Sequence, residues 1–420
     1  MSGALLQLTA TGASDQFLTG SPTVTAFRNV WRRHSPFATE NVLQAWSGET
    51  GWGRQSVSII SRQGDVLLDI WLEITLPDLS QYSAGGKKFK WANATGYQLI
   101  EYADCLIGGS KVQRIESNFM EAWDELTLPS TKKAGLDAMI GRYPDYDVAN
   151  AAKSSDAARK LFVPLRFFFC EETQLGLSLL AMQFVDVRIS VQFREFLSCV
   201  KSYTPAVAPE SSSQSIPNFT CSLWGNYAYL DTPERTRHSS QPMECLLTLT
   251  QSLTFPVDNS PSRKLDLSGF SHPVRELIWV YQSYDSTNGT PDSATDRFSF
   301  APVDPGENAN LKADFFTSAR LVANGHEREA ERDAMWYRLA VPYKTHSNTP
   351  TKPIYVFCFC LDPEDALAPS GAMNMSRMDN VSLFLKMSPT IAASGTVTVY
   401  ARSHNILKLS NGFASLVFSS

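Results

Sequence analysis

Six histidines are the side chains of this sequence best suited to bind a metal or exchange a proton near neutral pH: His34, His238, His272, His326, His346 and His404. None of them stands in an H-x-H or H-E-x-x-H pattern, the local spacings that bring two imidazoles to one ion. The sequence therefore shows no ligand set, and we predict no metal and no cofactor. Ligands from distant parts of the chain could still converge in space.

Cysteine and serine offer no clearer chemistry. The seven cysteines are odd in number, scattered and mostly set among apolar residues, which is typical of reduced core cysteines. Cys358 and Cys360 would share one face of a strand, but no second pair matches them. Ser376 lacks the G-x-S-x-G turn of a nucleophile, and the sequence gives it no paired histidine. We therefore predict no catalytic residue.

A polar loop follows Pro369-Ser370-Gly371 and interleaves polar residues with methionines. Its polar members are Asn374, Ser376, Arg377 and Asp379. We expect Arg377 and Asp379 to form charge-assisted hydrogen bonds that, together with Asn374 and Ser376, fix the loop at a seam between domains or subunits. This role is structural.

A second polar stretch, Ser283 to Asn310, is too long for a hairpin and too polar for a core, so we expect it to project from its domain. It contains Asn288 in one of several N-x-[ST] sequons. A chain in the cytosol would not meet the glycosylation machinery, so most of these sequons are chance matches. Asn288 is the candidate glycosylation site because its loop projects.

Composition limits the class of partner. The 420 residues carry a net charge of −5, which argues against a surface built to neutralise nucleic-acid phosphates. The N-terminus has no basic region followed by an apolar run, and no stretch approaches the roughly 20 apolar residues needed to cross a bilayer. We expect a soluble, cytosolic chain whose partner is another protein.

Two stretches share one pattern and suggest a duplication. Tyr355 to Cys360 and Val381 to Met387 are predicted strands on either side of the polar loop. An aromatic run, Phe167 to Cys170, and an alternating strand, Val187 to Phe193, repeat this order earlier in the chain. A short amphipathic helix over 115–126 also has a counterpart around Trp336, so each half contains one helical insertion.

Many short strands, Gly/Pro turns and inward/outward alternation indicate an all-β protein. A length of 420 residues exceeds what a single core usually holds, so we predict two domains. The fold class that fits is two tandem eight-stranded antiparallel jelly rolls, a double jelly roll with short helical insertions and long loops. We place an N-terminal arm at 1–45, the first jelly roll at 46–235 and the second at 242–420, separated by the polar, turn-like stretch Asp231 to Gln241.

The N-terminal segment and later stretches resemble the major capsid proteins of nucleocytoplasmic large double-stranded DNA viruses. The similar segments follow the family's order and span nearly the whole chain. They include LTGSPTVTAFRNVWRRHSPF, RQGDVLLDIWLEITLP, FVPLRFFFCEETQLGLSLLAMQFVDVRI and PSGAMNMSRMDN.

The resemblance implies a structural subunit that forms a homotrimer, a pseudo-hexagonal capsomer that tiles an icosahedral shell. Its partners would be neighbouring capsomers, minor capsid proteins and an inner membrane beneath the shell, with no direct nucleic-acid contact. The location implied is the virion capsid, assembled in the host cytoplasm. Two alternatives stay open: a minor capsid or assembly-scaffold protein of the same fold, and a glycan-binding jelly-roll protein.

The arm carries the candidate assembly residues, Trp31, Arg32, Arg33 and His34. By analogy with the family it would face the inside of the shell. Arg32 and Arg33 would then contact carboxylates or lipid headgroups below the capsomer; the competing interpretation is that they pair within their own chain.

Overall fold

The structure of the chain is a computed structural model. It describes residues 3–418 except 30, 81, 85–86, 143–156, 204–215, 259, 288–295, 303–313 and 389–394. The chain divides into two compact units, Met1–Pro36 and Phe37–Ser420. Each unit is described by itself.

The N-terminal unit contains two short helices, α1 (Gly3–Thr9) and α2 (Ala13–Thr19), neither of which has a buried residue. The α2 helix starts after Gly12, whose backbone N–H donates to Oδ2 of Asp15 at 2.9 Å. The predicted arm, 1–45, is too long, because Phe37–Gln44 forms strand β1 and pairs with β12. The residues of β1 are mostly exposed and show no regular apolar alternation, so the sequence carries no strand signal there.

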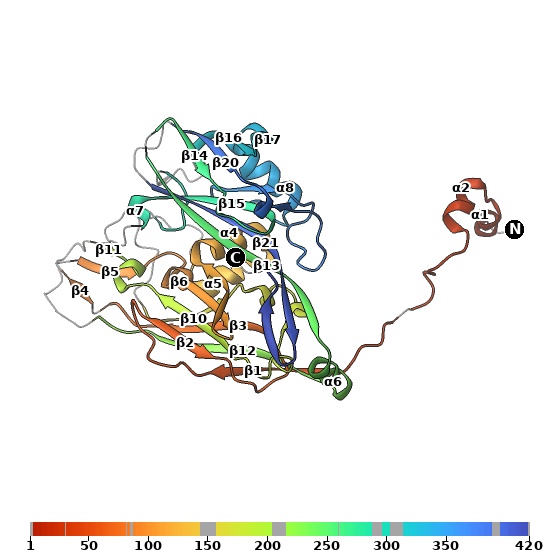
Figure 1. The fold of residues 1–420 in the computed structure, drawn as a ribbon, viewed down its shortest axis with the longest axis horizontal. Helices are drawn as coiled ribbons and strands as arrows, with labels where there is room; N and C mark the ends of the chain where they lie inside the picture. Colours follow the sequence, from red (N-terminus) through yellow and green to blue (C-terminus); the bar gives the residue numbers. More distant parts are fainter. Residues whose placement is uncertain are drawn as a thin grey trace. The chain divides into compact units, whose positions relative to one another are not determined.

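The first jelly roll has two sheets, and every strand pair in them is antiparallel (Figure 1). The main path of one sheet is β1 (Phe37–Gln44), β12 (Thr220–Leu230), β3 (Val66–Leu76) and β8 (Arg159–Pro164). The other sheet is β2 (Gln55–Ile59), β10 (Val187–Phe193), β6 (Ile100–Ile107) and β7 (Ser110–Glu116).

The second jelly roll repeats this topology strand for strand. One sheet runs β13 (Met243–Val257), β21 (Gly395–Ser410), β15 (Pro273–Ser283) and β18 (Ile354–Cys358). The other runs β14 (Ser262–Asp266), β20 (Val381–Met387), β16 (Phe316–Ala323) and β17 (His326–Asp333). The predicted double jelly roll is therefore confirmed, with eight main strands in each half.

Several smaller elements complete the sheets. The first half has a small additional sheet of β11 (Val200–Tyr203), β5 (Lys87–Trp91) and β4 (Ser83–Ala84). Three short strands extend the main sheets: β9 (Leu177–Ser178) pairs with β3, β19 (Met373–Asn374) with β15, and β22 (Phe413–Leu416) with β21.

Helical insertions occur at the same place in both halves, between the fifth and sixth main strands of each roll: between β7 and β8 in the first and between β17 and β18 in the second. In the first half they are α4 (Ser117–Thr127) and α5 (Ser130–Ile140), and α3 (Thr95–Leu99) precedes β6. In the second half a π-helical turn, Trp336–Ala340, continues into α8 (Val341–Thr345). A four-residue helix, α7 (Tyr284–Thr287), follows β15. The insertions that the sequence predicts are present in both halves.

Two local predictions were wrong. The aromatic run Phe168–Cys170 is a 3-10 turn, and the strand of that copy, β8, lies just upstream. The polar stretch between the halves is a helix, α6 (Thr232–Ser240). Asp231 caps α6 by accepting a bond from the backbone N–H of Thr232 at 2.7 Å, and Pro233 stands in its first turn, where a missing N–H is tolerated.

The hydrophobic interior forms two clusters. One lies inside the second jelly roll and includes Trp279, Tyr281 and Tyr355. The other begins in the first jelly roll and continues into the second, where it takes in Ile278, Val280 and Tyr400. Since residues 278 to 281 alternate between the two clusters, β15 is covered on both faces. The first and second rolls therefore share a continuous apolar boundary.

Candidate functional site

Several polar and charged groups are buried at the boundary between the rolls, and we call this boundary the seam. It is formed on one side by the sheet β13-β21-β15-β18 and the segment 346–352 of the second roll. On the other side lie helix α4 and the residues packed beside it in the first roll. Phe119 of α4 packs against Tyr400 of β21 with the rings tilted and their centroids 5.5 Å apart. The α4 helix is buried from Ser117 to Leu126, so it is enclosed by both rolls.

Matched polar groups cross the seam. The side-chain amides of Asn118 and Gln282 bond to each other in both directions, at 2.7 and 3.1 Å. Tyr400 donates its hydroxyl to Oε2 of Glu116 at 2.9 Å. The backbone N–H of Asn348 donates to the carbonyl of Leu126 at 2.9 Å. These bonds fix the register of one roll on the other, because a shift would leave buried polar groups unpaired.

Acidic residues of α4 form a second set of bridges. Glu121 pairs with Lys352 of the second roll and with Arg142 of the first. Glu125 accepts a bond from the hydroxyl of Thr351 at 2.9 Å. Burial by itself would raise the pKa of Glu125, but the charges of Lys352, Lys133 and Arg142 outweigh burial and hold this pKa at about 2. Glu125 is therefore ionised in the folded chain.

Arg402 is the central cation of the seam. Its guanidinium carbon lies 3.6 Å from the centroid of the Trp123 ring, a cation–π contact across the boundary. Nη2 bonds to Oε1 of Glu171 in the first roll at 2.8 Å, and Nη1 bonds to Oε1 of Glu276 at 3.1 Å. The Arg402 side chain is 1% exposed, so this charge depends on both carboxylates.

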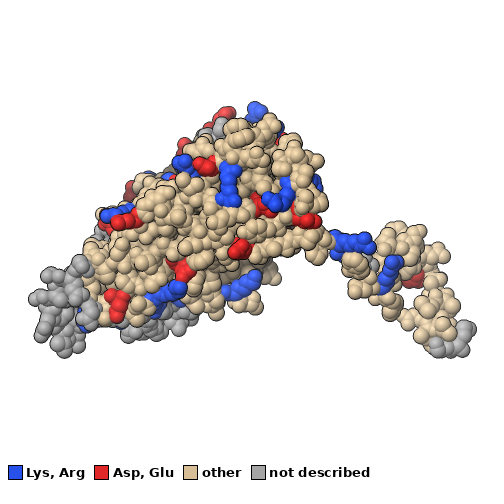
Figure 2. Space-filling model, turned by 90° about the horizontal axis from the view of Figure 1, so that it is seen from below, with Lys and Arg blue, Asp and Glu red and all other residues tan. Residues whose placement is uncertain are grey.

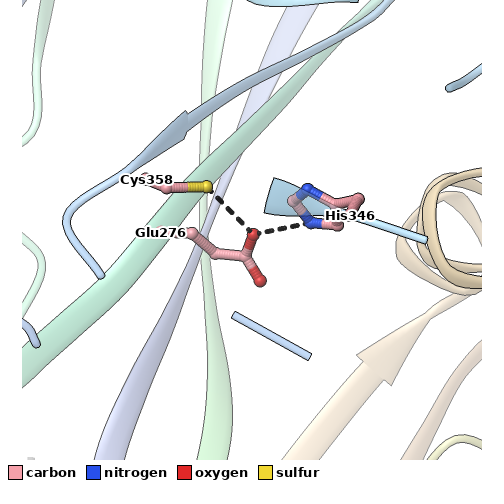
Figure 3. A group of neighbouring side chains, drawn as sticks. All are labelled: Glu276, His346 and Cys358. Atoms are coloured by element: carbon pink, nitrogen blue, oxygen red, sulfur yellow. Dashed lines mark hydrogen bonds and ion pairs between the residues drawn. The ribbon is translucent and has the colours of Figure 1, made fainter. Parts of the chain in front are cut away.

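Beside Arg402, three side chains from separate elements direct their polar ends at one another (Figure 3). Oε2 of Glu276, on β15, lies 3.1 Å from Nε2 of His346, which follows α8. The same oxygen lies 3.9 Å from Sγ of Cys358, on β18. Burial, reinforced by the Glu276 charge, raises the pKa of the Cys358 thiol well above its ordinary value.

Sequence reasoning missed this cluster for a physical reason. A metal pattern search finds ligands on one helix or strand, whereas these three come from two neighbouring strands and the end of a helix. The pairing of β15 with β18, which sets Glu276 opposite Cys358, is what brings two of them together. The only local sign was an acidic residue within the apolar strand 273–283, where a charge needs a partner.

The predicted assembly residues of the arm are all exposed. Trp31 is 68% exposed, and the guanidinium carbon of Arg33 lies 5.4 Å from its ring centroid. Among the described residues, no carboxylate pairs with Arg32 or Arg33. Contact with a partner below a capsomer therefore stays a prediction for these two residues and for His34.

The polar loop is anchored within the second roll. The side-chain oxygen of Asn374 accepts from the Ser376 N–H at 3.1 Å, and Oγ of Ser376 accepts from the His272 N–H at 2.7 Å. Arg377 and Asp379 are exposed, and neither bonds to another described residue. Two of the four predicted residues thus fix the loop, while the bonds predicted for Arg377 and Asp379 have no partner in the described part of this chain.

The long loop, 283–310, lies partly outside the described residues. Asn288, the candidate glycosylation site, lies outside the described residues. The later part of the loop does not project: Phe298 and Phe300 are buried in the cluster shared by both rolls, and Asp296 accepts from the side-chain amide of Asn93 at 2.9 Å. That part of the prediction was wrong: the burial of two phenylalanine side chains holds this part of the loop against the core although most of the residues around them are polar.

Two tandem jelly rolls locked by a buried seam define a double jelly-roll protein. Residues 25–231 match the family described as "Major capsid protein N-terminus", and residues 234–415 match "Large eukaryotic DNA virus major capsid protein". The chain is 32% identical to the major capsid protein of Pyramimonas orientalis virus and 29% identical to that of Phaeocystis pouchetii virus, each over the full length of both chains.

A chain of the PBCV-1 virus capsid has the same fold, with a TM-score of 0.76 and 22% identity over 94% of this chain and 100% of that one. The protein described here belongs to the family of major capsid proteins of large eukaryotic DNA viruses. The predicted family is thereby confirmed.

Proposed function

We propose that this chain is the repeating subunit of an icosahedral virus shell and that three copies form one pseudo-hexagonal capsomer. The observation that carries the proposal is the identical strand order of the two rolls. Three copies of a chain with two similar rolls place six similar modules around a threefold axis, and a six-sided unit can tile a surface. We place the two rolls at residues 37–235 and 242–420.

The seam supports this role because a hexagonal outline requires the two rolls to keep one relative orientation. The buried amide pair of Asn118 and Gln282 and the buried ion pairs favour a single register, whereas an apolar contact alone would tolerate sliding. The chain then acts as a rigid building block, and its work is mechanical. No catalytic step is assigned to it.

The partners in this proposal are two further copies, neighbouring capsomers, minor capsid proteins and an inner membrane, reached in part through Trp31, Arg32, Arg33 and His34. Direct nucleic-acid binding is not part of it. On the face shown in Figure 2, blue and red residues are interspersed among uncharged ones, without a basic stripe. Among the described residues, no helix is long and apolar enough to span a bilayer. Assembly would take place in the host cytoplasm.

Light scattering after size-exclusion chromatography tests the trimer. The expected mass is about three times the 46.6 kDa of one chain at protein concentrations above the dissociation constant of the trimer. A mass of 46.6 kDa under all conditions contradicts the trimer. Quantification of the chain in purified virions tests the shell role: hundreds to thousands of copies are expected, and a handful of copies would indicate a minor protein.

Deletion of residues 1–25 tests the arm, with substitution of Arg32 and Arg33 by alanine as the narrower variant. Incomplete particles with intact trimers are the expected result, since the compact unit Phe37–Ser420 does not include these residues. Complete particles at unchanged yield would contradict the assembly role of the arm.

A further inference from the structure

The cluster of Glu276, His346 and Cys358 has the composition of a metal site. It offers one carboxylate oxygen, one imidazole nitrogen and one sulfur, all within 4.8 Å of one another. Zinc commonly takes this mixture of ligands, whereas calcium and magnesium take oxygen ligands almost exclusively. We propose that these three residues bind a zinc ion that tightens the second jelly roll directly beneath the seam.

The distances fit a tetrahedral ion. With Zn–O and Zn–N of about 2.0 Å and Zn–S of about 2.3 Å, two ligand atoms in a tetrahedral site stand about 3.3 to 3.6 Å apart. The observed separations from Oε2 of Glu276 are 3.1 Å to Nε2 of His346 and 3.9 Å to Sγ of Cys358. Nε2 of His346 and Sγ of Cys358 lie within 4.8 Å of each other, so rotation of the His346 and Cys358 side chains toward the ion would complete the tetrahedral separations.

The imidazole provides an independent indication. The side chains of His346 and Glu276 are 0% exposed, and Nε2 of His346 has no aligned hydrogen-bond partner among the described residues. A buried nitrogen of this kind costs stability unless something binds it. The 3.1 Å contact with Glu276 supplies charge proximity but not that alignment. A metal ion at the centre of the cluster would satisfy the nitrogen.

Neighbouring groups already hold the ligands as an outer shell would. Nδ1 of His346 lies 3.0 Å from the hydroxyl of Thr345, so the ring is oriented with Nε2 toward the cluster. Arg402 occupies the other carboxylate oxygen of Glu276, Oε1, and leaves Oε2 for the ion. Thr345 also contacts Sγ of Cys358 at 3.4 Å. One hydroxyl therefore positions two of the three ligands.

On binding, the zinc ion replaces the proton of the Cys358 thiol. The divalent ion binds the sulfur of Cys358, the S–H bond breaks, and its proton leaves to solvent, while Glu276 and the neutral imidazole contribute lone pairs. No oxidant or reductant is needed. Cys358 is partly exposed, so an ion from solvent can reach the cluster at this residue. A water molecule would complete four-coordination.

The effect would be to tie β15, β18 and the end of α8 into one unit. His346 also contacts Trp123 of the first roll edge-on at 6.3 Å, and Arg402 stacks on that same ring. The ion would thus stabilise the surface on which the first roll rests. This role is structural and leaves the shell function unchanged.

The test uses the full chain without a polyhistidine tag, loaded with excess zinc and dialysed into zinc-free buffer. Elemental analysis should find about one zinc per chain, and Cys358→Ser should reduce it about tenfold. Thr345→Val should weaken binding about 10- to 100-fold. The matched control is Cys360→Ser, two positions along the chain, which should keep the ion because Cys360 is not in the cluster.

Cobalt provides a readout that does not need a folded variant. Cobalt added to the unaltered chain should give the near-ultraviolet charge-transfer band of a cobalt–thiolate bond, and zinc should abolish it. A chain that retains no zinc and shows no such band overturns the proposal. Equal loss of zinc in Cys358→Ser and Cys360→Ser also overturns it, because the ion would then be bound elsewhere.

Discussion

Strands β3 and β15 hold the same position in the two rolls, yet their surroundings differ. In β3, buried residues such as Ile70, Leu72 and Ile74 alternate with partly exposed Asp69, Trp71 and Glu73. In β15, every residue from Val274 to Ser283 is buried. The sheet that contains β3 packs one face on the core of the first roll and turns its other face outward. The sheet that contains β15 packs one face on the core of the second roll and the opposite face on the first roll.

The outward face of the first sheet is adapted to water. Nε1 of Trp71 donates to Asp69 at 2.7 Å, and Nε1 of Trp224 donates to Glu73 at 2.8 Å. The corresponding face of the second sheet carries Ile278, Val280 and Val356 and has no comparable exposure. The two rolls therefore share their strand order but not the surroundings of their corresponding sheets. In the second roll this sheet is buried on both faces, whereas in the first roll it keeps one face partly exposed.

Breaking the central cation of the seam should have the largest effect. Arg402→Ala leaves Glu171 and Glu276 without their shared partner, and the free energy of unfolding should fall by about 3–5 kcal/mol. Urea denaturation followed by tryptophan fluorescence measures it. Lys408→Ala is the control on the same strand, because its pair with Glu244 is 47% and 61% exposed and should contribute about 0–1 kcal/mol. Equal losses would mean that the seam is not a buried network.

Acid should weaken the seam more than the outward face. The pKa of Glu125 falls from 4.5 to about 2 on folding, so its contribution is present above about pH 4.5 and is lost as pH falls toward 2. Such a shift corresponds to about 3 kcal/mol. Glu125→Gln should therefore flatten the loss of stability between about pH 5 and pH 3. Glu73→Gln, on the outward face, should flatten it much less; an equal change would remove the distinction between the two sheets.

A single methylene should sharpen the comparison. Ile278→Val removes one buried methylene from the face of β15 that meets the first roll, and we expect a loss of about 0.5–1.5 kcal/mol in the free energy of unfolding. Ile59→Val, the same change at a residue that is 46% exposed, should have almost no effect. If the two variants unfold at the same denaturant concentration, the seam is not packed like a core.

The polar loop should give the smallest effect on the isolated chain. Ser376→Ala removes the bond to the His272 N–H, and stability should fall by about 0.5–1 kcal/mol. Arg377→Ala should leave stability unchanged within about 0.5 kcal/mol, because the side chain is exposed. A lower yield of trimers or particles from Arg377→Ala alone would place this residue at an interface between subunits, and normal assembly would contradict that placement.

The sequence predicts elements well wherever one periodicity dominates. Val381–Met387 and the helix around Trp123 lie where alternation and helical spacing place them. Phe37–Gln44 was missed because this edge strand is exposed along most of its length and has no regular apolar period. Phe168–Cys170 was misread because aromatic residues fill a core equally well from a turn.

The seam could not be predicted, since it depends on which of two similar sheets is covered. The unbroken apolar run from Leu277 to Tyr281 is its one visible trace, and such a run does not say what covers it. The cluster of Glu276, His346 and Cys358 depends in turn on strand pairing. Contacts between distant segments of the chain are set by tertiary packing and leave no local pattern.

Strand β17 forms the free end of its sheet and is composed almost entirely of ionisable residues, HEREAERD, nearly all exposed. Its pairing with β16 is interrupted by irregularities. A regular apolar edge would invite another chain to add itself as a further strand, and the reaction would have no natural end. The charges and the broken register remove that template. Even at high concentration, this edge therefore offers no template along which the chain could grow into fibres.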